Sequence, residues 1–221
     1  MNKSNSIKVE ESLPIGLELA LVGGFMDAYT YINRGSVFAT GQTGNLVLMG
    51  IRLSIKDYYG ALMALVPIVF FLFGVFAAQY SKDKMHIAQN RYYQSDILIF
   101  EIVILFFVGF LPAAVPNYIA NAIISFVSAM QFSSFRTMIN GPYSTVFCTG
   151  NMRSFAELFY KGIFEKDKEA FSSAASYAVI ILAFLSGGII SAVLSQHLFV
   201  KTIWVACALL IIPLISINRS R

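Results

Sequence analysis

The sequence contains two similar stretches, GFMDAYTYINRGSVFATGQTGN at residues 24–45 and MQFSSFRTMINGPYSTVFCTGN at residues 130–151. Aligned without a gap, they place Gly35 on Gly141, and both end in Thr-Gly-Asn. Each begins near the end of an apolar run and continues into a segment that contains glycine. Such self-similarity indicates a duplicated architecture. The alternative is chance similarity between two apolar, glycine-containing segments.

The composition is that of a membrane protein. Hydrophobic residues make up 57% of the 221 residues and charged residues only 13%, whereas soluble domains carry about 25% charged residues. A soluble protein this apolar could not cover its surface with polar side chains. The composition therefore predicts an all-α membrane protein whose surroundings are the lipid bilayer.

Six apolar runs are long enough to be transmembrane helices, and we expect them to form a single domain over residues 1–221. The first run contains two acids and lacks a small-residue cleavage pattern, which favours a retained helix over a signal peptide. The six predicted spans are Leu13–Ile32, Tyr58–Tyr80, Ile97–Val115, Tyr118–Ile139, Phe171–Gln196 and Phe199–Ile217.

The distribution of basic residues predicts the orientation. Lys and Arg concentrate in the segments on the same side of the membrane as the two termini, at 81–96 and 140–170 and in both tails. The positive-inside rule then places both termini in the cytoplasm. The net charge of +4 is explained in the same way, so we expect no nucleic-acid partner.

The two stretches divide the six spans into halves of three, at about 13–115 and 117–217. A second similarity, between Phe71-Leu-Phe-Gly74 and Phe184-Leu-Ser-Gly187, supports this division. These tetrapeptides are 113 residues apart, seven more than the 106 residues that separate the two similar stretches. We assign the seven extra residues to the charged segment 165–169 and its neighbours. With three spans in each half, the halves cross in opposite directions. We expect an inverted 3+3 repeat, broken at the two Thr-Gly-Asn motifs, as in secondary transporters.

Asp27 is the strongest candidate for a functional residue. It lies thirteen residues beyond Pro14, about 20 Å along the first helix. A lone carboxylate at that depth is costly and marks a functional site by default. Burial favours the protonated form, so Asp27 is a candidate proton carrier. The alternative is a structural carboxylate that accepts hydrogen bonds from backbone amides of the broken segment 33–45.

The two Thr-Gly-Asn motifs are candidates for binding a substrate or ion. Each precedes a short apolar or amphipathic stretch, and irregular backbone at membrane depth lines a cavity or is buried in protein. We expect two half-helix starts facing a central site, or else two ordinary caps at the membrane surface. The predicted binding residues are Asp27, Thr43, Gly44, Asn45, Gln131, Thr149, Gly150 and Asn151.

Two other acids lie in the predicted spans. Glu18 and Arg136 are at similar depths in helices that run in opposite directions, so they form a possible ion pair. The alternative is that each snorkels to the interface. Glu101 lies five residues into the third span, and its role stays open, with snorkelling as the simplest interpretation.

No cofactor or metal site is predicted. The two cysteines and two histidines are far apart in the sequence, and we find no catalytic triad pattern or metal-ligand spacing. We therefore do not expect an enzyme.

Residues 24–28, Gly35, 38–39 and 43–50 resemble the signature of the YoaK-like family, and Met130-Gln131, Arg136, Gly141 and 149–151 extend the resemblance to the second half. This family consists of bacterial inner-membrane proteins of about this length with a domain of unknown function. The resemblance implies a multi-pass protein of the bacterial inner membrane.

These observations favour a transporter of a small molecule or ion, with Asp27 as the candidate for coupling transport to protons. Because six spans make a small carrier, we expect a possible homodimer. The alternative is a non-transporting membrane protein that binds lipid or acts as a scaffold for a partner, with structural polar residues.

Overall fold

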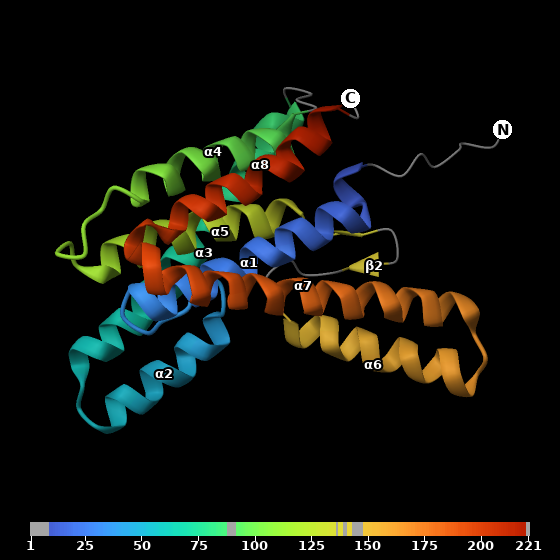
Figure 1. Cartoon of the computed structure of the whole chain (residues 1–221), viewed down its shortest axis with the longest axis horizontal. Helices are drawn as coiled ribbons and strands as arrows, with labels where there is room; N and C mark the ends of the chain where they lie inside the picture. Colours follow the sequence, from blue (N-terminus) through green and yellow to red (C-terminus); the bar gives the residue numbers. More distant parts are fainter. Residues whose placement is uncertain (1–8, 88–91, 136, 139–140, 143–147, 220–221) are drawn as a thin grey trace.

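The computed structural model describes residues 9–87, 92–135, 137–138, 141–142 and 148–219, and these are almost entirely helical. Helices α2 and α6 extend from the side of a bundle formed by the other α-helices (Figure 1). In chain order the elements are η1 (Val9–Glu11), α1 (Leu13–Asn33), α2 (Gln42–Ser54), α3 (Tyr58–Ile87), α4 (Tyr93–Val108), α5 (Asn117–Ser134), β1 (Thr137–Met138), β2 (Gly141–Pro142), α6 (Cys148–Phe164), α7 (Lys168–Leu198), η2 (Phe199–Thr202) and α8 (Ile203–Arg219).

Five of the predicted spans each correspond to one α-helix, and the sixth corresponds to η2 and α8, with corrected boundaries. Helix α4 ends at Val108 instead of Val115, because Gly109 and Pro112 interrupt the run. Helix α5 ends at Ser134, five residues before the predicted end at residue 139, which lies outside the described residues. The predicted stretches after the two motifs are helices α2 and α6, and the motifs lie inside their first turns instead of preceding them.

Two described stretches are long and apolar enough to cross a membrane. They are Tyr58–Lys84, within α3, and Lys168–Arg219, which comprises α7, η2 and α8. The second contains 52 residues, about twice the length needed for one crossing.

Helix α1 is the central element. Its buried residues include Leu19, Phe25 and Met26, which join a core built with side chains of α4, α5 and α8. Helix α1 lies along α7, and α3 lies along α5 (Figure 1). Helix α2 packs on α3, α6 packs on α7, and α4 packs on α8.

These helix pairs match when α1–α4 are exchanged with α5–α8. The α1–α7 pair corresponds to α5–α3, α2–α3 corresponds to α6–α7, and α1–α8 corresponds to α5–α4. The α4–α8 pair maps onto itself.

Glycines allow the close approach of the two long pairs. In α7, a Cβ atom at Gly187 would overlap with the carbonyl oxygen of Leu21 in α1. In α3, a Cβ atom at Gly74 would overlap with the carbonyl oxygen of Phe126 in α5. Because Gly74 and Gly187 end the two similar tetrapeptides, the similarity reflects equivalent contacts between helix backbones.

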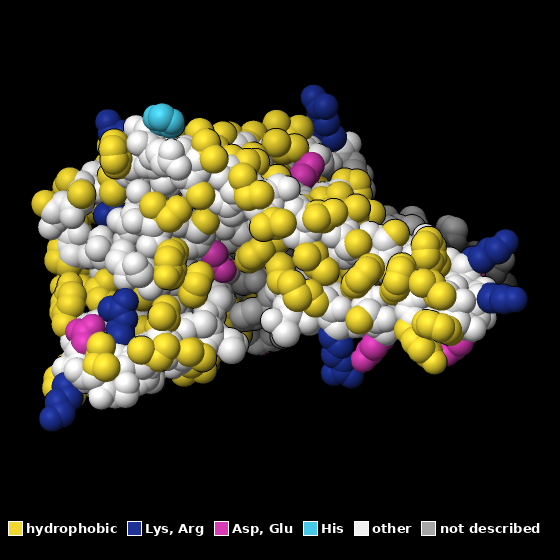
Figure 2. Space-filling view, turned by 60° about the horizontal axis from the view of Figure 1, so that its bottom comes forward, with side chains coloured by type: hydrophobic (Ala, Val, Ile, Leu, Met, Phe, Trp, Pro, Cys, Tyr) yellow, Lys and Arg dark blue, Asp and Glu magenta, His cyan; other side chains and the backbone are white. Residues whose placement is uncertain are grey.

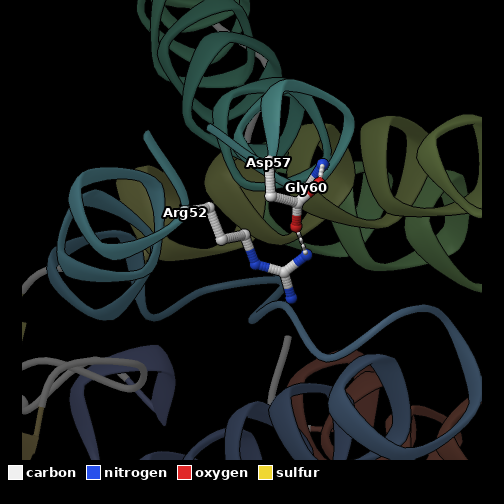
Figure 3. Close-up of polar contacts among 3 residues, drawn as sticks. All are labelled: Arg52, Asp57 and Gly60. Atoms are coloured by element: carbon white, nitrogen blue, oxygen red, sulfur yellow. Dashed lines mark hydrogen bonds and ion pairs between the residues drawn. The ribbon is translucent and has the colours of Figure 1, made fainter. Parts of the chain in front are cut away.

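The turns before α3 and α7 are also equivalent. Lys56 has a φ of 60° and Lys166 a φ of 57°. The aspartate that follows each accepts a hydrogen bond from the amide three residues later, Gly60 to Asp57 at 2.9 Å and Ala170 to Asp167 at 3.0 Å. Figure 3 shows Asp57, which also faces Arg52 at 3.7 Å.

These turns correct the position of the extra residues in the second half. The Lys-Asp pairs are 110 residues apart, four more than the motifs, and α6 has 17 residues where α2 has 13. The other three of the seven extra residues lie within α7, before Gly187. Three residues are close to one helical turn, so the glycine keeps its face.

We expect Gly187→Ala to lower the midpoint of thermal unfolding in detergent, because the new methyl group overlaps with the backbone of α1. Such overpacking costs about 1–3 kcal/mol. Gly188→Ala is the matched control, since its Cβ would lie 3.7 Å from the oxygen of Gly24, an ordinary contact. Equal midpoints for the two variants would contradict this close contact between α1 and α7.

Candidate functional site

The site is organised around the non-helical segment 34–41, which connects α1 to α2 inside the protein. Val37, Ala39 and Thr40 are buried. The segment begins with Gly35 at φ 91° and Ser36 at φ 57°, left-handed conformations that turn the chain back after α1. Buried irregular backbone requires hydrogen-bond partners for its N–H and C=O groups.

Asp27 provides partners for the end of this segment. Its Oδ1 accepts hydrogen bonds from the amides of Thr40 at 2.7 Å and Gly41 at 3.3 Å. These amides directly precede α2, whose N-cap residue Gly41 has no side chain to act as a cap. The carboxylate therefore acts as a cap supplied by α1. This is the structural role considered above.

Asn45 holds the middle of the segment. Its Oδ1 accepts a hydrogen bond from the amide of Phe38 at 2.9 Å, and its Nδ2 donates to the carbonyl oxygen of Phe38 at 2.7 Å and to Oε1 of Gln42 at 2.9 Å. The side chain is fully buried. Asn45 therefore positions the segment, and its amide group is already engaged within the protein.

Asp27 and both motifs border one cavity. This cavity of about 220 Å³ is lined by Asp27, Phe38, Gly41, Thr43, Gly44, Cys148, Thr149 and Phe184. The first turns of α2 and α6 therefore border the same space beside α1 and α7 (Figure 1). Figure 2 shows an acidic side chain with hydrophobic side chains near it, between the region of α2 and the projecting region where α6 packs on α7.

A larger cavity of about 580 Å³ adjoins the first and extends along α1 and α7. The two cavities share Asp27, Phe38, Cys148 and Phe184. The carboxyl group of Asp27 thus lies where the larger, mostly apolar cavity adjoins the smaller, more polar one. Asp27 is 8% exposed and forms no ion pair with a described basic residue.

The other predicted binding residues lie elsewhere. Gly150 is exposed, and Asn151 is buried in the first turn of α6. Gln131 in α5 is fully buried, and neither polar atom of its side chain has a hydrogen-bond partner among the described residues. Neither cavity is lined by Asn45, Gln131, Gly150 or Asn151.

The possible Glu18–Arg136 pair involves residue 136, which lies outside the described residues. Glu18 is partly buried in α1. Glu101 is fully buried, so the simplest interpretation, snorkelling to the interface, is wrong. Its side chain lies in the packed interior of the bundle, and neither carboxyl oxygen has a hydrogen-bond partner in the described chain.

Arg34 is a structural residue that was not among the predicted site residues. It is fully buried. Its Nε donates to the hydroxyl of Tyr29 at 3.1 Å, and one terminal nitrogen donates to the carbonyl oxygen of Leu111 at 2.9 Å. Its own carbonyl oxygen accepts from Asn121 at 2.7 Å. Arg34 thus ties the end of α1 to α5 and to the α4–α5 turn. The available signal was an arginine two residues beyond the end of the predicted span Leu13–Ile32.

In the described chain, no group of three or more His, Cys, Asp or Glu side chains lies close enough to hold a metal ion. The candidate site therefore consists of one carboxylate, a thiol, two threonines and an apolar wall.

Comparison with known proteins gives one family and one curated relative. The family described as "Protein of unknown function (DUF1275)" matches residues 15–216. The UPF0700 transmembrane protein YoaK of Bacillus subtilis (strain 168) is 27% identical over 200 residues, which cover 87% of this chain and 88% of that protein. No solved structure matches.

We expect Asn45→Ala to lower the free energy of unfolding by about 2–5 kcal/mol, because the amide and carbonyl of Phe38 both lose their partner inside the protein. Thermal unfolding in detergent measures this change. Leu46→Ala, at the next position and 53% exposed, is the matched control and is expected to change the midpoint little. Similar effects of the two substitutions would show that Asn45 does not hold the segment.

Proposed function

Because this chain belongs to the DUF1275 family, and thus to the YoaK-like membrane proteins that its motifs resemble, we propose that it transports a small molecule or ion across the bacterial inner membrane. The observation that carries this proposal is the cavity bordered by Asp27 and by residues of both Thr-Gly-Asn motifs. A site between two repeats is typical of secondary transporters.

The proposed architecture is six spans in an inverted 3+3 repeat with both termini in the cytoplasm. Three independent features support it: the exchangeable helix pairs, the two Lys-Asp turns and the two glycine contacts. Helices α2 and α6 are the short helices that start at the shared cavity, one from each half. The positive-inside count supports the orientation.

Asp27 has two roles in this proposal. The carboxylate holds the start of α2 through the amides of Thr40 and Gly41, and the same residue faces the cavities. A protonated carboxyl group is a weaker acceptor than a carboxylate. Proton binding therefore loosens the start of α2 and changes the wall of the site, which couples protonation to the shape of the cavity.

A second candidate function is lipid binding without transport. It is favoured by the larger cavity, whose apolar walls along α1 and α7 suit an acyl chain. The two candidates differ in whether water reaches the residues around Asp27.

Cys148 is a native reporter of water access. It lines both cavities, whereas Cys207 is 7% exposed and packed against α4. In the Cys207→Ser variant, we expect a small water-soluble thiol reagent to modify Cys148 in membrane vesicles. In the Cys148→Ser variant, labelling of Cys207 should be about tenfold slower or less, because a buried thiol is protected. Equally slow labelling of both thiols would indicate a dry site and favour lipid binding.

The direct test is ligand-dependent stability followed by flux. We expect a solute from a panel of metabolites and ions to raise the unfolding midpoint of the purified protein, since a ligand at a hundred times its Kd stabilises by about 2.7 kcal/mol. Asp27→Asn, which keeps an oxygen to accept both amides, should abolish the shift while remaining folded. Uptake of that solute into proteoliposomes should depend on Asp27.

If no solute shifts the midpoint and Asp27→Asn only melts earlier, Asp27 is a structural residue. The transport proposal is then rejected in favour of the lipid-binding or scaffold role.

A further inference from the structure

The larger cavity has one charged group in a mostly apolar lining. Besides Asp27, the residues that line it are glycine, alanine, aliphatic and aromatic residues, with one methionine and one cysteine. The smaller cavity adds Gly41, Thr43, Gly44 and Thr149, none of which carries a charge. None of the described residues that line either cavity is Lys, Arg or His.

The nearest basic residues along the chain are engaged elsewhere. Arg34 points to Tyr29 and to the carbonyl oxygen of Leu111. Arg153, one turn into α6, is exposed and pairs with Glu157 at 2.8 Å. The negative charge of Asp27 is therefore compensated within the described site by two backbone amides and by no cation. A charge buried in this way favours a positively charged partner, either a proton or a cationic ligand.

The apolar part of the site adds a second preference. Tyr31 and Phe38 stack with their ring centroids 5.2 Å apart, and both line the larger cavity. Aromatic faces attract cations, most strongly where water is excluded. A cavity of about 580 Å³ lies within the range of drug-sized ligand sites. An inorganic cation would leave this apolar space unused.

We infer that the site binds monovalent organic cations with an apolar body, and that such a cation and a proton compete for the carboxylate of Asp27. The inference rests on the proposed transport function and gives its substrate class and its coupling. When the cation binds, Asp27 releases its proton to water. When the cation leaves, the proton returns. A single carboxylate that serves both ions yields exchange of one proton for one cation.

The other titratable groups that line the cavities with Asp27 do not account for a pH dependence of cation binding. In the described chain they are the thiol of Cys148 on α6 and the phenol of Tyr31 on α1, and the lining residues of α7 and of segment 34–41 are not titratable. Thiols and phenols ordinarily titrate well above the range in which carboxyl groups do. The pH dependence of cation binding therefore reports on Asp27.

Tetraphenylphosphonium and tetraphenylborate are suitable probes, because they have the same shape and opposite charge. We expect the purified wild-type protein to bind the phosphonium at least about tenfold more tightly than the borate, a difference of about 1.4 kcal/mol. Below the pKa of Asp27, the phosphonium affinity should fall about tenfold per pH unit, as competition with one proton requires. At a pH well below the pKa of Asp27, binding in weak buffer should release close to one proton for each cation, and well above that pKa it should release none.

Asp27→Asn should weaken phosphonium binding at least about tenfold and remove its pH dependence, while Glu157→Gln, which changes an exposed acid on α6, should leave both unchanged. If Asp27→Asn does not fold, the pH dependence and proton release of the wild type decide the question. Equal binding of the two probes, or binding without proton release at a pH well below the pKa of Asp27, would overturn the inference. A neutral or anionic solute whose uptake depends on Asp27 would also overturn it and leave the transport proposal intact. If the wild-type protein neither binds the phosphonium nor shows Asp27-dependent uptake of any solute, both the inference and the transport proposal are rejected.

Discussion

The interior of this protein depends on the hydrogen bonds that hold a non-helical segment among packed helices. Away from water, each unpaired amide or carbonyl of segment 34–41 is costly. Asp27 accepts hydrogen bonds from the amides that precede α2. Asn45 accepts a hydrogen bond from the amide of Phe38 and donates one to its carbonyl oxygen. These contacts determine where α2 begins and hence where its first turn borders the cavity.

The position of Asp27 links stability to the proposed chemistry. A carboxylate used only as a cap could be fully enclosed, and one used only for binding would not need two backbone amides. Asp27 contacts the amides and lines both cavities. Any partner that changes its charge also changes the strength of its hold on α2. In the proposed carrier, this link connects ion binding to the movement of a wall of the site.

The two halves are similar in architecture and different in charge. Glycine contacts and Lys-Asp turns recur in both halves, whereas the residue that aligns with Asp27 in the second stretch is Ser133. One carboxylate therefore borders a cavity that is lined by residues of both halves. Two carboxylates in the same apolar space would repel one another and raise the cost of burial. A single acid is consistent with exchange of one positive charge for another.

The sequence by itself determined the helical class, the membrane setting, the approximate helices and the paired motifs, because hydrophobic run length and internal similarity are properties of the chain. It also singled out Asp27, since an acid inside an apolar run is costly wherever the helix lies. Tertiary structure alone decided which side chains meet. Asn45 holds Phe38, Arg34 ties α1 to the α4–α5 turn, and Glu101 lies inside the bundle. These outcomes depend on how each helix is rotated and packed against its neighbours, and hydropathy along one chain contains no information about that rotation.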